Sequence, residues 1–128
     1  MIVVDSSALL ALILDEEDAD RFADALVGSA EAVMSVANLV EASIVLARRG
    51  EHADSLLDET LHQLGIRPVD ITVEQGQLAR EAHRRFGRGR HPAKLNFGDC
   101  FAYALAKSLD APLLFKGGDF AQTDVKAA

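Results

Sequence analysis

Residues 2–13 read IVVDSSALLALI, and this stretch indicates the class of fold that the rest of the chain completes. The apolar run Ile2–Val4 predicts a short buried strand, because a strand covered on both faces has no alternating polar positions. Asp5 ends the run, and Ser6 and Ser7 are residues that favour the start of a helix. A strand that passes directly into a helix predicts an α/β protein.

The same arrangement of a short strand followed by helical segments recurs along the chain. Further strands are predicted at 32–36, 66–69 and 113–115, and two helical stretches separate each strand from the next. Pro68 has no amide hydrogen to donate, so the third strand is predicted to be short or to lie at an edge. Val125 suggests a fifth strand at the edge. We therefore predict a small parallel sheet of four or five short strands, covered by helices on both faces.

The composition is that of one ordinary domain. The chain has 128 residues, of which 49% are hydrophobic, and this is enough for a core. No apolar run approaches the roughly 20 residues of a membrane-spanning helix. The N-terminal apolar segment is interrupted by Asp5, which is not expected within a signal peptide. We therefore expect a cytoplasmic protein with no membrane attachment. Cys100 is the only cysteine, which excludes an internal disulfide and a cysteine zinc site.

Four acidic residues occupy equivalent places in this pattern. Asp5 and Asp119 follow strands, Glu41 lies early in a helical stretch, and Asp99 opens another helix. In a parallel α/β sheet the strand ends and helix starts gather at one edge, where ligands bind. Carboxylates collected there repel one another unless a cation holds them. The pattern indicates a site for a hard cation, Mg²⁺ or Mn²⁺, that acts in phosphate chemistry.

Asp5 and Glu41 each have a structural alternative. An acid at the end of a buried strand is costly unless it is paired or binds a metal, but Asp5 is also a good N-cap. Ser6 and Ser7 are able to serve as that cap, which leaves Asp5 free for a functional role. Glu41 has the ordinary alternative of a solvated helical glutamate. Its helix nevertheless has a run of apolar residues that we predict to face inward: Leu39, Val40, Ile44 and Ala47.

Asp99 and Asp119 have structural alternatives too. Asn96 followed three residues later by Asp99 matches a capping box, which would stabilise the start of the helix. The residues after Asp99 are almost wholly apolar, so the helix is predicted to be central. Asp119 follows two glycines and suits a turn. Asp124 is a rival to Asp119 for a fourth position in the site.

The charge of the chain is unevenly distributed. The net charge of −7 argues against long-range attraction to nucleic acid. Residues 83–94, however, contain no acid and lie just before Asp99, so they are suited to holding a phosphate backbone beside an acidic pocket. The alternative is a solvated loop. The basic residues concerned are Arg84, Arg85, Arg88, Arg90 and Lys94.

Other classes of phosphate-handling protein fit the sequence less well. A receiver-type phosphoacceptor domain would use Asp5, Asp70 and Lys116, but it presents two adjacent acids after its first strand, where this chain has Ser6 and Ser7. A haloacid-dehalogenase-type phosphatase needs a second aspartate at the position of Ser7. Paired helices between strands also disagree with the strict alternation of a receiver domain.

The chain resembles the PIN-domain ribonucleases, and among them the VapC-type toxins of type II toxin–antitoxin systems. Four segments carry the resemblance, in the order and spacing of that family: VVDSSALLA (3–11), SVANLVEA (35–42), NFGDCFAYALAK (96–107) and LLFKGGDFAQTDV (113–125). Together they span almost the whole chain. The resemblance implies that residues 1–128 form a single PIN-like nuclease domain, a three-layer α/β/α sandwich.

The resemblance also implies an activity and a set of partners. The implied activity is Mg²⁺-dependent endonucleolytic cleavage of RNA, with Mn²⁺ as a substitute, by a toxin that a VapB-type antitoxin blocks. A homodimer and a toxin–antitoxin hetero-oligomer are the implied assemblies. Asp5 and Asp99 would be metal ligands, with Glu41 and Asp119 completing the catalytic acids. Many PIN domains have an acid where this chain has Gly117, so the role of Asp119 is open. A PIN-like module that binds without cleaving is the alternative.

Overall fold

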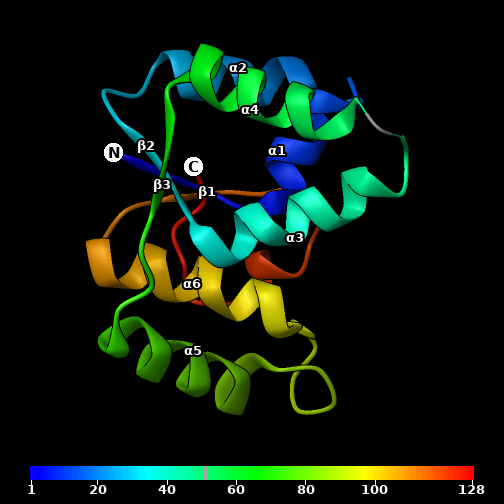
Figure 1. Cartoon of the computed structure of the whole chain (residues 1–128). Coiled ribbons are helices and arrows are strands. Elements are labelled where there is room, and N and C mark those ends of the chain that lie inside the picture. Colours follow the sequence, from blue (N-terminus) through cyan, green and yellow to red (C-terminus); the bar gives the residue numbers. More distant parts are fainter. Residues whose placement is uncertain (51) are drawn as a thin grey trace.

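The computed structural model describes residues 1–50 and 52–128, and it contains one parallel sheet of four strands. The strands are β1 (Ile2–Val4), β2 (Ala32–Ser35), β3 (Ile66–Val69) and β4 (Leu113–Leu114), in the spatial order β3-β2-β1-β4 (Figure 1). β1 pairs with β2 on one side and with β4 on the other. The N-terminal strand is therefore central, and the chain needs its last strand to complete the sheet.

Six α-helices cover the sheet in two layers. The helices are α1 (Ser6–Ile13), α2 (Ala19–Val27), α3 (Val36–Ala47), α4 (Ala53–Leu64), α5 (Val73–Phe86) and α6 (Phe97–Leu109), and a short 3₁₀ turn, η1, spans Phe120–Gln122. Figure 1 shows α1, α2 and α4 on one side of the strands and α5 and α6 on the other. The predicted three-layer α/β/α sandwich and the predicted order of elements are confirmed.

The alternation of side chains along the strands divides the core in two. Val3 and Val33 point to the side of α5 and α6, whereas Ile2, Val4 and Met34 point to the side of α1, α2 and α4. All three residues of β1 are buried, with at most 4% of their surface exposed. A strand covered on both faces has to be apolar throughout, and this explains why Asp5 is the first polar residue of the chain.

Two expectations for the sheet edges have different outcomes. Pro68 does lie in an edge strand, where Arg67 and Pro68 are exposed and no further strand needs the missing amide hydrogen. The fifth strand at Val125 is wrong. β4 has only two residues, so the C-terminal segment forms a single isolated bridge between Leu113 and Ala127. Val125 instead packs, partly buried, against the core on the α6 side.

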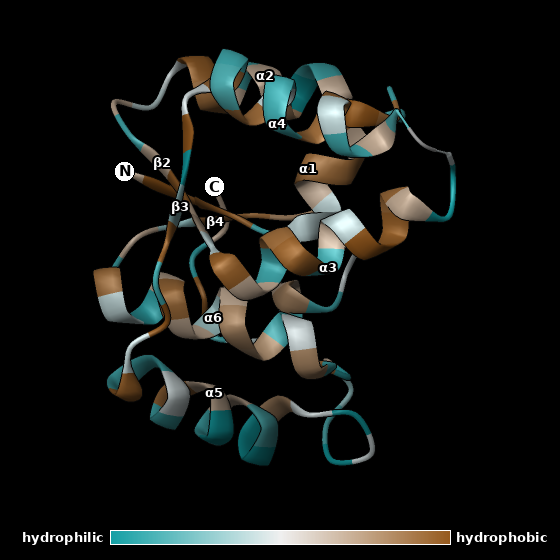
Figure 2. Cartoon of the chain, in the orientation of Figure 1, coloured by the Kyte–Doolittle hydropathy of each residue, from teal (hydrophilic) through white to brown (hydrophobic). Residues whose placement is uncertain are grey.

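The orientation predicted for α3 is also wrong. The buried face of α3 consists of Asn38, Ala42 and Leu46, and it turns the opposite residues Val40 and Ile44 outward, with 54% and 52% of their surface exposed. Ala47 is exposed and Leu39 is partly buried. The helix is apolar around most of its circumference, as Figure 2 shows by comparison with the mostly hydrophilic α5. Periodicity alone therefore could not identify its inner face.

Among the described residues, no helix has both the length and the apolar character that crossing a membrane requires.

Candidate functional site

The four predicted acids come from four different elements. Asp5 directly follows β1, Glu41 lies on α3, Asp99 is in the first turn of α6, and Asp119 stands at the start of η1, after β4. Burial is the main cause that raises the pKa of Asp5 and of Asp99; the charges of Asp99 and Glu41 add to it at Asp5, and those of Glu41 and Asp119 add to it at Asp99. The fold thus brings the acids within electrostatic range of one another at the carboxyl end of the central strands.

Asp5 is the most buried of these acids, with 2% of its surface exposed. Its Oδ2 accepts hydrogen bonds from the backbone nitrogen of Ser7, at 3.0 Å, and from the Ser7 hydroxyl. Asp5 is therefore the N-cap of α1, and the expectation that Ser6 or Ser7 replaces it there is wrong. Its Oδ1 is buried without a hydrogen-bond partner among the described residues. Burial, reinforced by Asp99 and Glu41, raises the pKa of Asp5 to about 7.

Glu41 is fixed by small polar groups and by a close approach of two helices. Its Oε1 accepts hydrogen bonds from the Ser6 hydroxyl and, at 3.4 Å, from Asn38 Nδ2. Asn38 Nδ2 also donates to the carbonyl of Gly98 at 2.9 Å. A Cβ atom at Gly98 would lie 2.1 Å from Glu41 Oε2, which is far inside contact distance. A Cβ at position 98 would therefore displace the Glu41 carboxylate from its place against the start of α6.

Asp99 forms the predicted capping box at the start of α6. Its Oδ2 accepts a hydrogen bond from the backbone nitrogen of Asn96 at 3.0 Å, and its own nitrogen donates to Asn96 Oδ1 at 2.9 Å, so the capping box is formed. Burial, with repulsion from Glu41 and Asp119, raises the pKa of Asp99 to about 6. Burial, followed by repulsion from Asp99, also raises the pKa of Cys100 to about 11, which keeps that thiol protonated in the core.

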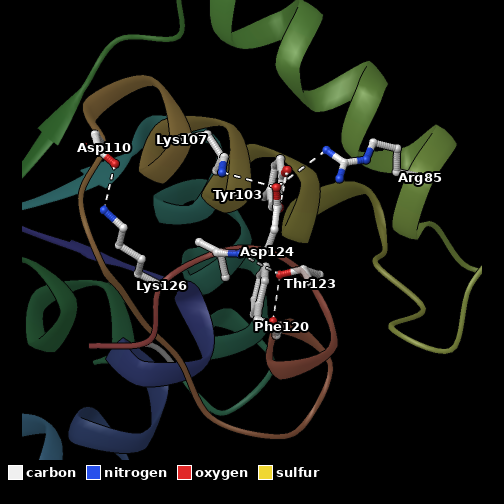
Figure 3. A network of polar contacts seen from close by, with 9 residues as sticks. Arg85, Tyr103, Lys107, Asp110, Phe120, Thr123, Asp124 and Lys126 are labelled. Carbon is white, nitrogen blue, oxygen red and sulfur yellow. Dashed lines mark hydrogen bonds and ion pairs between the residues drawn. The ribbon is translucent and has the colours of Figure 1, made fainter.

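The structure separates the two rivals for the fourth position. Asp119 is exposed, makes no capping hydrogen bond and acts electrostatically on Asp99. Asp124 belongs to a different network, shown in Figure 3, in which it accepts a hydrogen bond from the Tyr103 hydroxyl at 2.7 Å and pairs with Lys107 and Arg85. Desolvation alone would raise the pKa of Asp124, but hydrogen bonds from Tyr103 and Lys107 and the charges of Lys107 and Arg85 lower it.

Sequence reasoning missed the polar residues that hold the acids. Ser6 and Ser7 were interpreted only as helix caps, but they orient Glu41 and Asp5. The Ser7 hydroxyl also accepts a hydrogen bond from the backbone nitrogen of Lys116 at 3.0 Å, which ties the end of β4 to the end of β1. Asn38 is completely buried. Its position one helical turn before Glu41 is the signal that could have identified it.

The donor groups of this site fit a hard divalent cation. Within the described part of the chain, no three Asp, Glu, His or Cys side chains are placed as a ready metal cage. Mg²⁺, however, keeps most of its water and needs only one or two carboxylates. The unpartnered, buried Oδ1 of Asp5 and the mutual repulsion of the acids are features that a bound cation would relieve. Asp5 and Asp99 have the oxygen chemistry to hold it.

The predicted basic residues do not act as one group. Arg84 and Arg88 line a groove between α5 and α6, and Arg90 and Lys94 are exposed in the loop after α5. Arg85 faces elsewhere, since it pairs with Asp124 at 3.6 Å (Figure 3) and stacks over the ring of Phe86. A backbone hydrogen bond from Arg88 to the carbonyl of Leu95, at 3.0 Å, closes the loop.

Comparison with protein families matches residues 2–126 to the PIN domain, and the chain belongs to that family. Within it, the curated relatives are VapC proteins. Ribonuclease VapC30 of Mycobacterium tuberculosis is 46% identical over 124 residues, which cover 96% of this chain and 95% of the relative. Ribonuclease VapC of Mycolicibacterium smegmatis is 46% identical over 126 residues, with 98% of each chain covered. The chain is thus a VapC-type PIN-domain protein, and the receiver-domain alternative is excluded.

Solved structures support the same fold. The crystal structure of Mycobacterium tuberculosis VapC20, described as a sarcin-ricin loop cleaving toxin, superposes with a TM-score of 0.80 at 19% identity and covers 100% of this chain and 98% of its own. A toxin–antitoxin complex from Klebsiella pneumoniae superposes with a TM-score of 0.74 at 15% identity, covering 100% and 97%. At these identities the agreement concerns the arrangement of helices and strands.

The raised pKa values of the acids predict a pH-dependent stability in the absence of divalent metal. Folded Asp5 and Asp99 bind protons more tightly than in the unfolded chain, where the value is 3.8. Their stabilising contribution is therefore complete below pH 3.8 and is lost as the pH rises through about 6 and 7. In EDTA, the free energy of unfolding of the wild type should fall by on the order of a few kcal/mol between pH 5 and pH 8. Asp5→Asn should show a smaller fall, because asparagine does not ionise. Urea unfolding of both proteins tests this, and equal pH slopes would contradict it.

The contact between Gly98 and Glu41 predicts a strong effect of a single methyl group. Gly98→Ala should lower the free energy of unfolding by about 1 kcal/mol, because the displaced Glu41 carboxylate loses its hydrogen bonds from Ser6 and Asn38. Gly76→Ala is the matched control, since a Cβ at Gly76 meets no atom within 4 Å. That control should be up to about 1 kcal/mol more stable, because alanine favours a helix interior. Urea denaturation measures both, and a neutral Gly98→Ala would disprove the tight contact.

Proposed function

We propose that residues 1–128 form one nuclease domain that hydrolyses RNA phosphodiester bonds endonucleolytically with Mg²⁺, and that the chain is the toxin of a toxin–antitoxin pair. One observation supports this most directly: a buried, partly unpartnered Asp5 in electrostatic contact with Asp99 and Glu41, at the strand ends of a VapC-type fold. PIN-domain ribonucleases generally depend on a divalent metal. The 46%-identical relatives are named ribonucleases.

In this proposal Asp5 and Asp99 hold the cation, and Glu41 and Asp119 complete the acidic site. A bound Mg²⁺, or Mn²⁺ in its place, supplies an activated water and a positive charge beside the phosphate. Ser7 orients Asp5 with hydrogen bonds from its backbone nitrogen and its hydroxyl, and that hydroxyl accepts another from the backbone nitrogen of Lys116. Cleavage by water leaves a 5′-phosphate and a 3′-hydroxyl. Protons compete with the cation for Asp5 and Asp99, so activity should rise with pH up to about 7.

The substrate is held by local charge in a chain whose net charge is −7. Arg84 lies on α5, and Arg88, Arg90 and Lys94 follow that helix; all four are exposed. Figure 1 shows α5 on the same side of the sheet as α6. They are suited to neutralising phosphates that flank the acidic site. Arg85 contributes less in this proposal, because its guanidinium is engaged by Asp124.

The proposal includes two protein partners in the cytoplasm. A VapB-type antitoxin is expected from the VapC relationship, and one structural neighbour is described as a toxin–antitoxin complex. We expect a second copy of the chain to bind at the outer face of α3 and form a dimer. Val36, Val40 and Ile44 form a stripe on its outer face with 39%, 54% and 52% of their surface exposed, and exposed apolar patches mark protein interfaces. A hetero-oligomer of toxin dimers and antitoxin follows from the two interactions.

Cleavage of labelled total RNA by purified protein tests the proposed activity. Wild type should cut with Mg²⁺ and not with EDTA, and Asp5→Asn and Asp99→Asn should each lose about 100-fold or more, because even residues that support metal ligands matter by 10–100-fold. Asp58→Asn, on the exposed face of α4, is the control and should keep full activity. Full activity in folded Asp5→Asn would refute the mechanism. Wild type that binds RNA but never cuts it would favour a non-cleaving binding module.

The proposed dimer is tested by charges on the apolar stripe of α3. Wild type should sediment as a dimer, and Val40→Asp combined with Ile44→Asp should sediment as a monomer, because buried unpaired carboxylates oppose association. Val27→Asp is the control, since Val27 lies on α2 with 84% of its surface exposed. A monomeric wild type at tens of micromolar protein would rule out this interface.

A further inference from the structure

A groove of about 680 Å³ lies between α5 and the start of α6, and the proposed mechanism uses only the charges of Arg84 and Arg88 from its lining. It exists because α5 has small residues, Gly76 and Ala79, where it passes the aromatic start of α6. A Cβ at Gly76 would meet no atom within 4 Å, so this part of the groove is open space. Its walls are chemically distinct: aromatic on the α6 side and basic on the α5 side.

The aromatic wall is formed by Phe97 and Phe101. The two rings meet edge to face, with centroids 5.0 Å apart and planes at 75°. Phe101 is partly buried, whereas Phe97 has 80% of its surface exposed. A phenylalanine ring held by one neighbour and otherwise open to solvent presents a flat apolar face, on which a planar ligand can stack.

The basic wall is formed by Arg80, Arg84 and Arg88. The first two lie one helical turn apart on α5, and Arg88 follows the end of that helix. No acidic residue lines the groove, and none of these three arginines forms an ion pair with any residue that the structure describes. Arg85, by contrast, does form an ion pair, with Asp124. Three uncompensated cations in a chain of net charge −7 favour an anionic ligand.

The groove adjoins the acids through the start of α6. Asn96 lines the groove and also caps Asp99. Phe97 directly precedes Gly98, which packs against Glu41. Phe97 and Asp99 are thus two residues apart in the first turn of α6, so the groove and the acidic site meet at the same end of this helix.

We propose that this groove is a subsite for an unpaired base of the RNA, next to the phosphate that is cleaved. The base stacks on Phe97, and Arg84 and Arg88 hold its phosphates. Stacking on aromatic rings combined with backbone neutralisation is how proteins bind single-stranded RNA. A base inside a duplex is already stacked on its neighbours, so the groove suits an unpaired base, and an aromatic face does not distinguish one base from another. The inference rests on the proposed ribonuclease function and adds a base-binding subsite to it.

The absence of tryptophan from the chain permits a direct test. Phe97→Trp places a single fluorophore in the groove, and Val27→Trp places one on α2 as a control with similar exposure. Both carry Asp5→Asn to prevent cleavage. An unpaired hexaribonucleotide should quench the tryptophan at 97 and not the one at 27. The same strand without bases, and the hexaribonucleotide paired in a duplex, should quench neither.

Affinity and kinetics give an independent readout. In the Asp5→Asn background, Phe97→Ala and Arg84→Gln should each weaken binding of the hexaribonucleotide about ten-fold. In the otherwise wild-type chain, Phe97→Ala should raise KM by a similar factor, and Phe97→Tyr should restore it because tyrosine keeps the stacking face. Circular dichroism of each variant confirms the fold.

The possible failures are distinguishable. RNA that is bound and cut normally, without quenching at 97 and without an effect of Phe97→Ala, overturns the subsite and leaves the nuclease intact. Equal quenching by the strand without bases overturns stacking. Quenching at 97 that appears on raising protein concentration without RNA shows that a second copy fills the groove, and this also overturns the proposal. Wild type that neither binds nor cuts RNA removes the nuclease function itself.

Discussion

Repulsion among carboxylates at the end of a buried strand is the constraint around which this structure is arranged. Asp5 follows three apolar residues of β1 and stays inside the protein, where a charge is costly. Two other acids, Glu41 and Asp99, are brought toward it rather than kept away. A stable fold tolerates this only because each carboxylate receives hydrogen bonds from small, rigid donors. The remaining imbalance is the feature that a cation would correct.

The helices have a second task in addition to covering the sheet. α6 packs its apolar residues across the strands, and its first turn presents Asp99 to the site and Phe97 to the groove. The capping box fixes that turn, so stability of the helix and position of the carboxylate have the same cause. Asn38 adds the link to α3 by bonding to Gly98. Glu41 and Asp99 are therefore held on helices rather than on loops.

The sequence was sufficient for the order of elements, because β1 and β4 are wholly apolar, β2 is apolar up to Ser35, and the segments between the strands have good helix starts. It also placed the four acids at one edge, since parallel strands require this. It failed on α3, where Val40 and Ile44 look like core residues and lie at the surface. It failed too on Ser6, Ser7 and Asn38, whose importance depends on partners up to 109 residues away. Such contacts have no local pattern.

The hydrogen bond between Lys116 and Ser7 has a consequence for the synthesis of the protein. It joins residues that are 109 positions apart in the chain, and β4, which flanks β1, is only two residues long and ends at Leu114. During synthesis, Asp5 therefore leaves the ribosome long before the strand that completes its surroundings. The carboxylates assemble only after residues 113–119 have emerged, so shorter nascent chains do not contain the complete site.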